Sequence, residues 1–205
     1  MPRMTPAERR EAIIEAALRV MVGKGMAATT VRDVAHDMGT SSGLIHHYFE
    51  SMDDLLAAAF DRAAGRDLDA TRTTMTRGAG PVEQLSIFFA TYVRAEQDWA
   101  FQLWLDAWAE AARRPAVRET SQRLNVAWQQ LLAETIRAGV EHGVMACGDP
   151  EAAAWRILSL LDGLALQAVA HRLPLDRRVV ITWSVAYAEA ELSLLSGSLG
   201  CDARQ

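Results

Sequence analysis

The stretch "TTVRDVAHDMGTSSGLIHHYFESMDDLL", which runs from Thr29 to Leu56, contains two short segments separated by a glycine. The segments, Val31–Met38 and Ser41–Tyr48, are each about two helical turns long. Gly39 between them supplies a backbone conformation that a bulkier residue would resist. Two short helices joined in this way predict a helix-turn-helix, whose second helix can enter the major groove of DNA.

The side chains of these two segments separate into an inner and an outer set. Apolar residues are expected to pack the two helices against each other and against a preceding helix: Val34, Ala35, Met38, Leu44 and Ile45. Polar residues project outward from the second helix: Ser41, Ser42, His46 and His47. The outer set is therefore available to a partner such as DNA.

The remainder of the chain is also predicted to be helical. Capping boxes at Thr5–Glu8 and Thr30–Asp33 mark two helix starts, and prolines or glycines separate the later apolar-periodic segments. The expected helices lie close to residues 6–22, 31–38, 41–48, 52–77, 81–92, 98–113, 115–143, 150–171 and 176–192. The sequence thus predicts an all-α fold of about nine helices, with no strand and no internal repeat.

Charge is distributed unevenly along the 205 residues. The first fifty residues carry six positive and six negative side chains, so the rest of the chain carries the whole net charge of −5. An isoelectric point near 5.5 is not the global footprint of a nucleic-acid-binding protein. Any contact with DNA therefore has to come from local geometry.

Several classes of function find no support in the sequence. The chain has no metalloprotease, nucleophile-elbow, Walker A or dinucleotide-binding motif, so we expect no enzymatic activity and no cofactor. His46 and His47 point about 100° apart on a helix, so they are poorly placed to bind one metal ion. Cys147 and Cys201 are isolated, and no apolar run reaches the length of a membrane span or a signal peptide. We expect a cytoplasmic protein that does not bind membranes.

The opening stretch resembles the N-terminal signature of the TetR family of bacterial repressors. The matching residues are Thr30, Val34, Ala35, Gly39, Ser41, Gly43, Ile45, Tyr48, Phe49, Ser51 and Leu55. The segments "WLDAWAEAARRPAVRETSQRLNVAWQQLLAETIRAGVEHG" and "LLDGLALQAVAH" are similar to the C-terminal domain of the BetI-like branch, which is named for a choline-responsive repressor. The resemblance covers most of the chain.

The resemblance implies a DNA-binding domain over residues 1–50 and a ligand-binding and dimerisation domain over residues 51–205. It implies a homodimeric repressor that reads a palindromic double-stranded operator and releases it when a small-molecule effector moves the fourth helix. The residues placed at DNA by this resemblance are Thr30, Arg32, Ser41, Ser42, Leu44, His46, His47 and Tyr48. His46 stands where the family usually has tyrosine.

Two positions depart from the family pattern. Ser42 is often a cation in relatives, and Met52 replaces the lysine that commonly begins the fourth helix and contacts phosphate. Each phosphate contact contributes roughly −0.9 to the log–log salt slope of DNA binding, so we expect a shallow slope. Protonation of His46 or His47 is expected to restore some positive charge at mildly acidic pH. An alternative reading is a helical small-molecule binding protein with weak or lost DNA binding.

The tryptophans of the C-terminal part suggest an effector site. Trp104 and Trp108 share one helix face, and Asp162 interrupts an apolar segment. Core packing is the simpler reading of such aromatics. The functional reading is a pocket lined by these three residues, which suits an organic cation or a hydrophobic compound. Small residues in the last two helices permit close helix packing, as a four-helix dimer interface requires.

Overall fold

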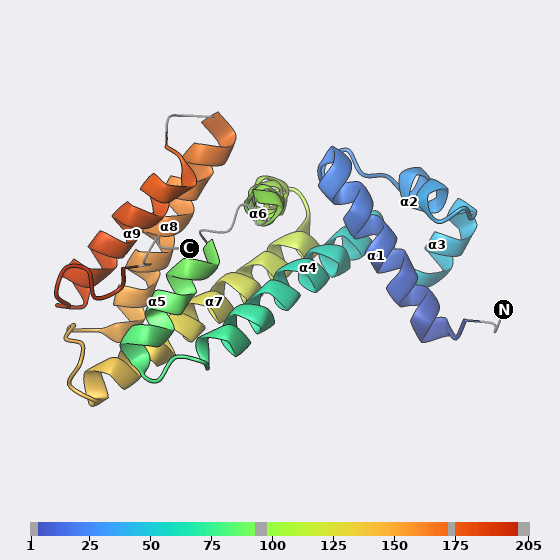
Figure 1. Ribbon diagram of the computed structural model, residues 1–205. Helices are drawn as coiled ribbons and strands as arrows, with labels where there is room; N and C mark the ends of the chain where they lie inside the picture. The colour runs from blue at the N-terminus through green and yellow to red at the C-terminus, as the bar shows by residue number, and fades with distance from the viewer. Residues whose placement is uncertain (1–3, 93–97, 172–174, 201–205) are drawn as a thin grey trace. The chain divides into compact units, whose positions relative to one another are not determined.

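The computed structural model describes residues 4–92, 98–171 and 175–200. Within these ranges the chain forms helices and no strand, which confirms the predicted all-α fold. The described helices (Figure 1) are α1 Pro6–Lys24, α2 Val31–Asp37, α3 Ser42–Tyr48, α4 Met52–Met75, α5 Pro81–Tyr92, α6 Asp98–Ala111, α7 Pro115–Glu141, α8 Pro150–His171 and α9 Arg177–Glu191. Cys201 and Pro174 lie outside the described residues.

Side-chain caps begin several of these helices where the sequence indicated them. At α1 the amide of Glu8 donates to Thr5 Oγ1 at 3.2 Å, and the amide of Thr5 donates back to the Glu8 carboxylate at 2.8 Å. At α4 the amide of Asp54 donates to Ser51 Oγ at 3.1 Å. Asp176 caps α9 in the same manner. Each cap satisfies backbone amides that the first helical turn leaves without a partner.

Three helices, α4, α6 and α7, end two residues earlier than the sequence predicted. α4 ends at Met75, two residues before the expected end, and α6 ends at Ala111. Beyond α6 the amides of Arg113 and Arg114 both donate to the carbonyl oxygen of Glu110, at 2.9 Å each. This tightened last turn ends the helix ahead of the proline that follows.

The chain divides into two compact units. The head unit comprises Met1–Arg66 and Gln102–Leu124, and the second unit comprises Asp67–Phe101 and Asn125–Gln205. The helices α4, α6 and α7 each contribute residues to both units. The head unit therefore contains more of the chain than the three N-terminal helices alone.

An apolar core holds the head unit together. The inward residues Val34, Ala35 and Ile45 are at most 3% exposed, as predicted, while Leu44 is only half-buried. The fully buried side chains of this core also come from α1, α4 and the α1–α2 turn: Ile13, Met21, Met26, Leu55, Leu56 and Phe60. The four N-terminal helices therefore share a single core.

The turn of the helix-turn-helix follows from one backbone conformation. Gly39 has φ +62°, in the left-handed region that favours glycine. The amide of Thr40 then donates to the carbonyl oxygen of Ala35 at 2.9 Å. This hydrogen bond closes α2 and directs the chain into α3.

The second unit has its own core, in which α8 packs against α9. Among the described helices, α8 is the one long and apolar enough to cross a membrane by length and composition alone, over Pro150–Ala170. The sequence pattern did not indicate this, because Arg156 and Asp162 interrupt its apolar run. Only 33% of this segment is buried, so much of an apolar helix faces outward.

We predict that Ile13→Ala lowers the free energy of unfolding by about 2–5 kcal/mol, because it leaves a cavity in the head core. The side chain of Ile13 is 0% exposed. Val22→Ala on the same helix is the control, since Val22 is 52% exposed. We expect it to change stability by less than about 0.5 kcal/mol. Urea unfolding of both variants measures the difference, and equal effects would contradict the assignment of the core.

Candidate functional site

The helix-turn-helix presents a groove between the start of α2 and the recognition helix α3. Its lining residues are Thr30, Val31, Arg32, Ser42 and His46, around a volume of about 570 Å³. Four of these residues were predicted at the DNA interface. The groove thus brings a cation, a hydroxyl and an imidazole to one open surface.

Thr30 is committed to capping α2. Its hydroxyl donates to Asp33 Oδ2 at 2.5 Å and accepts from the amide of Asp33 at 3.3 Å. Lys24 lies 2.7 Å from the same carboxylate, and together with the Thr30 hydrogen bonds it lowers the pKa of Asp33 to about 2. The carboxylate is therefore ionised at neutral pH and offsets the charge of Lys24.

Arg32 is the cation that lines the groove. It is exposed and forms no ion pair with any residue that the structure describes. Arg19 instead pairs with Asp37 at 2.5 Å, and Arg10 lies 4.8 Å from the ring centre of Phe49. Lys24 and Arg19 are thus paired with acids, whereas Arg9, Arg10 and Arg32 form no ion pair with any described residue.

The recognition helix exposes both of its histidines. His46 lines the groove, whereas His47 packs its ring edge-on against Tyr48 with a centroid separation of 5.1 Å. Ser41 precedes α3 as its N-cap but makes no side-chain capping hydrogen bond, so its hydroxyl stays available. No cluster of metal-ligating side chains occurs among the residues that the structure describes.

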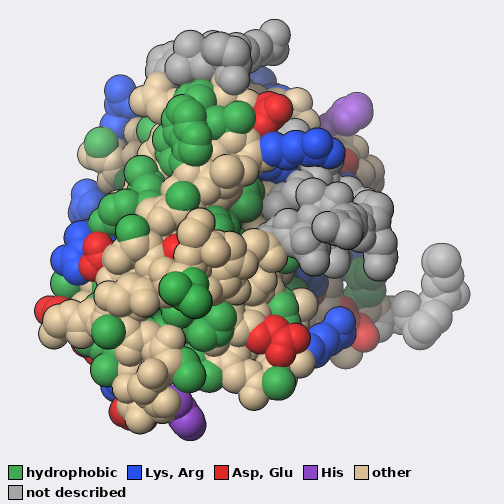
Figure 2. Space-filling model, turned by 60° about the vertical axis from the view of Figure 1, so that its left-hand side comes forward, with side chains coloured by type: hydrophobic (Ala, Val, Ile, Leu, Met, Phe, Trp, Pro, Cys, Tyr) green, Lys and Arg blue, Asp and Glu red, His purple; other side chains and the backbone are tan. Residues whose placement is uncertain are grey.

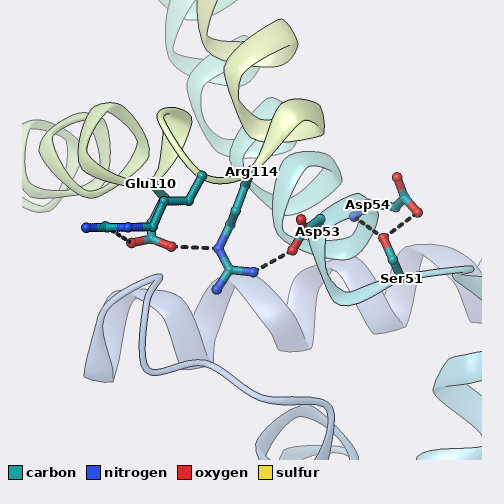
Figure 3. A network of polar contacts seen from close by, with 6 residues as sticks. Ser51, Asp53, Asp54, Glu110 and Arg114 are labelled. Atoms are coloured by element: carbon teal, nitrogen blue, oxygen red, sulfur yellow. Dashed lines mark hydrogen bonds and ion pairs between the residues drawn. The ribbon is translucent and has the colours of Figure 1, made fainter.

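Met52 begins α4 as a packing residue. Its side chain is partly buried against the head core, in the position where the family commonly carries a phosphate-binding lysine. The two acids that follow Met52 are bonded to other residues (Figure 3). Arg114 lies 2.5 Å from Asp53, and the Ser51 hydroxyl donates to Asp54 at 2.6 Å. The start of α4 therefore offers apolar contact and no unpaired cation.

Arg114 joins two helices of the head unit (Figure 3). Its Nε donates to the carboxylate of Glu110 at the end of α6 at 2.6 Å, and its other contact is Asp53 in α4. These hydrogen bonds raise the pKa of Arg114, with the bond to Glu110 as the largest cause. Glu110 is 8% exposed, so the pair is largely shielded from solvent.

The predicted effector residues are distributed over both units. Trp104 and Trp108 belong to the head unit, where Trp104 packs on Phe60 at 4.9 Å and on Trp108 at 5.7 Å between ring centres. Asp162 belongs to the second unit. The contacts of the two tryptophans are those of packing residues.

A second set of aromatic residues, which sequence reasoning missed as a site, lies in the second unit. This aromatic cluster consists of Phe88, Phe89, Tyr92, Phe101 and Trp128. The ring centre of Tyr92 lies 5.0 Å from that of Phe88, 5.7 Å from that of Phe101 and 6.3 Å from that of Trp128. The four-residue spacing of Phe88 and Tyr92 was the available signal.

Two acids act on this cluster. Burial raises the pKa of Tyr92 well above its usual value, and the charges of Asp162 and Asp67 raise it further. Burial also raises the pKa of Asp162 to about 7. Asp162 has no hydrogen-bond or ion-pair partner among the described residues, although part of its side chain is exposed. A desolvated carboxylate with some access to solvent is suited to receive a cation.

Arg177 contacts two residues of the aromatic cluster. Its Nη1 donates to the carbonyl oxygen of Tyr92 at 3.0 Å, and its guanidinium lies 5.6 Å from the ring centre of Phe101. Desolvation lowers the pKa of Arg177. Arg177, the first residue of α9, therefore contacts both Tyr92 at the end of α5 and the ring of Phe101 in α6.

Comparison with known proteins finds two family models that match successive parts of the chain. Residues 13–59 match the model for bacterial regulatory proteins of the tetR family. Residues 81–193 match the C-terminal model for BetI-type transcriptional repressors. The HTH-type transcriptional regulator BetI of Rhizobium meliloti is 30% identical over 186 residues, which cover 90% of this chain and 89% of that protein.

Solved structures of other transcriptional regulators have a fold similar to that of this chain. A transcriptional regulator from Saccharomonospora viridis in complex with choline has a TM-score of 0.81 and 26% identity, covering 91% of this chain and 98% of the other. A transcriptional regulator from Pseudomonas aeruginosa has a TM-score of 0.78 and 27% identity, covering 92% of each chain. The chain therefore belongs to the TetR family of bacterial transcriptional regulators, with a C-terminal domain of the BetI type.

Proposed function

We propose that this regulator is a repressor that binds a palindromic operator as a homodimer and releases it when a small organic cation occupies the second unit. The observation that carries the DNA-binding part is the open groove between α2 and α3, which presents Arg32, Ser42 and His46 together. A helix of this kind reads base edges while flanking side chains contact phosphates. We assign residues 1–50 to DNA binding and residues 51–205 to effector binding and dimerisation, in the cytoplasm.

The predicted interface residues take different roles in this proposal. Arg32 contacts a phosphate or a base, and Ser41, Ser42 and His46 face the major groove. His47 and Tyr48 contact the DNA backbone beside them. Leu44 and Thr30 act by holding the helices, since the Thr30 hydroxyl is already bonded to Asp33.

The effector part rests on Asp162 and the aromatic cluster. Aromatic faces attract organic cations, and a desolvated carboxylate supplies the opposite charge. Tyr92, Phe101 and Asp162 are each partly exposed. The choline complex of the Saccharomonospora viridis relative supports a cationic effector. That Trp104 and Trp108 also bind the effector is a separate proposal.

The dimer part rests on the exposed apolar residues of α8 and α9. Figure 2, in which the side carrying these helices comes forward, shows groups of apolar side chains on that face. Trp155 on α8 is 41% exposed and Trp183 on α9 is 53% exposed. Exposed aromatic residues of this size mark an association surface, and a twofold dimer matches a palindromic operator.

The alternative function is a small-molecule binding protein with weak DNA binding. The pairing of head cations with acids and the packing of Met52 favour it. A mobility-shift assay with the DNA upstream of the protein's own gene separates the two functions. Specific binding supports the repressor, and its absence together with effector binding supports the alternative.

The salt dependence of operator binding tests the role of Arg32. Arg32→Ala is expected to make the log–log salt slope shallower by about 1 for each phosphate that Arg32 neutralises, or to weaken binding by about 1–3 kcal/mol if Arg32 reads a base. Arg77→Ala, an exposed cation of the second unit, is the matched control and is expected to change neither. Fluorescence anisotropy at several salt concentrations measures both, and identical behaviour of the two variants would refute the role of Arg32.

The ionisation of Asp162 predicts a pH dependence of effector binding. The pKa of Asp162 is raised to about 7, so its negative charge is largely present at pH 8 and largely lost at pH 6. Choline affinity is therefore expected to fall as the pH decreases, by up to about tenfold per pH unit below the pKa. Asp162→Asn is expected to bind weakly at both pH values. Asp69→Asn, at an exposed position, is the control, and calorimetric titration measures the affinities.

Tryptophan fluorescence then locates the ligand. Trp128 belongs to the aromatic cluster, so Trp128→Phe is expected to abolish the change in emission that choline causes. Trp104→Phe and Trp108→Phe are expected to retain it. The reverse result would place the ligand at the two tryptophans of the head unit. A response to hydrophobic compounds alone would exclude the cationic effector.

The association surface predicts the effect of one charge on the oligomeric state. Trp183→Glu is expected to convert the dimer to a monomer, because it places a charge in an apolar interface while Trp183 contributes little to the fold of one protomer. Val144→Glu, at a position 47% exposed outside α8 and α9, is the control. Light scattering after size exclusion measures both masses, and a dimer in both variants would reject this surface.

A further inference from the structure

The helix α6 contains residues of both units. Phe101 belongs to the second unit, where its ring packs on Tyr92 and faces Arg177. The residues from Gln102 to Ala111 belong to the head unit. The single helix α6 therefore carries one ring of the aromatic cluster, Phe101, and then residues of the head unit.

Asp106 bonds α6 to the turn between α1 and α2. Its Oδ2 accepts a hydrogen bond from the amide of Met26 at 3.0 Å, and Gln102 donates to its Oδ1 at 2.9 Å. The turn is shaped to receive this carboxylate, since Gly25 has φ +87° and a side chain there would come within 3.3 Å of Oδ2. Met26 itself is 0% exposed.

The turn in question directly precedes α2. Thr29 donates to the carbonyl oxygen of Gly25 at 2.8 Å, and the α2 cap begins at the next residue, Thr30. The turn bonded to Asp106 therefore leads directly into the start of α2, which lines the groove. A carboxylate that accepts from a backbone amide forms one of the stronger types of hydrogen bond.

Asp106 and Phe101 lie in the same helix, α6. Asp106 follows Phe101 by five residues, which corresponds to about 7.5 Å of helix. Two further contacts hold the same helix to α4 within the head unit: Trp104 on Phe60, and Arg114 between Glu110 and Asp53. These contacts hold α6 to α4, and Asp106 holds the same helix to the turn.

We propose that Asp106 is a positioning residue that couples effector binding to operator binding, by fixing the α1–α2 turn to α6. This inference rests on the proposed function. An effector that inserts against Phe101 displaces the start of α6. The hydrogen bond from Met26 then moves or breaks, which alters the orientation of α2 and lowers operator affinity. The coupling requires the effector to prefer the displaced arrangement.

The first test needs no effector. Operator binding to the wild type is expected to slow amide hydrogen exchange over Gln102–Ala111 by about fivefold or more, because coupling is reciprocal. Asp106→Ala is expected to remove this protection while operator affinity changes by less than about threefold. Asp69→Ala is the charge-matched control and keeps the protection. Unchanged protection in Asp106→Ala overturns the proposal.

The second test uses choline chloride as the probe. Choline is expected to weaken operator binding by the wild type about tenfold and by Asp106→Ala less than about twofold, while choline affinity itself is retained. Asp106→Asn keeps a carbonyl oxygen for Met26 and is expected to restore most of the response. A full response in Asp106→Ala, or none in Asp106→Asn, overturns the proposal.

The two tests separate the possible failures. A wild type that ignores choline contradicts the proposed effector class, and the exchange experiment then decides the role of Asp106 alone. If Asp106→Ala melts below the assay temperature, Asp106→Leu replaces it, since it keeps side-chain volume and helix propensity without an acceptor. Asp106→Leu with wild-type protection of α6 overturns the proposal equally.

Discussion

Burial of one apolar core by four helices is the constraint on which the DNA-binding surface depends. α2 and α3 are only seven residues each, too short to be stable alone, so their orientation comes from packing on α1 and α4. The fully buried Val34 and the nearly buried Ile45 fix the inner faces. Because these faces are fixed, Arg32, Ser42 and His46 are turned together toward one groove.

The sequence predicted this part of the molecule well because local signals and packing agree there. The capping pairs, the left-handed Gly39 and the inward set of Val34, Ala35 and Ile45 follow from residue type and spacing. Helix ends were less predictable. The end of α6 depends on a tightened turn around the Glu110 carbonyl, which periodicity does not encode.

The aromatic cluster could not be predicted in the same way. Tyr92, Phe101 and Trp128 lie on three different helices, and only tertiary packing brings their rings together. Sequence reasoning singled out Asp162 as an unusual acid, and it named Trp104 and Trp108 because their spacing is visible within one helix; their role as effector residues stays a prediction. The pairing of Asp106 with the Met26 amide likewise joins residues eighty positions apart.

The neutralised head has a consequence for how the regulator is distributed in a cell. Genomic DNA offers a vast excess of non-specific sites, and a protein's affinity for them comes almost entirely from cations that contact phosphates. With Lys24 and Arg19 held by acids and Met52 in place of a cation, we expect few molecules to be retained on random sequence. A larger share of the pool is then expected to stay free, so that operator occupancy would follow the copy number of the protein closely.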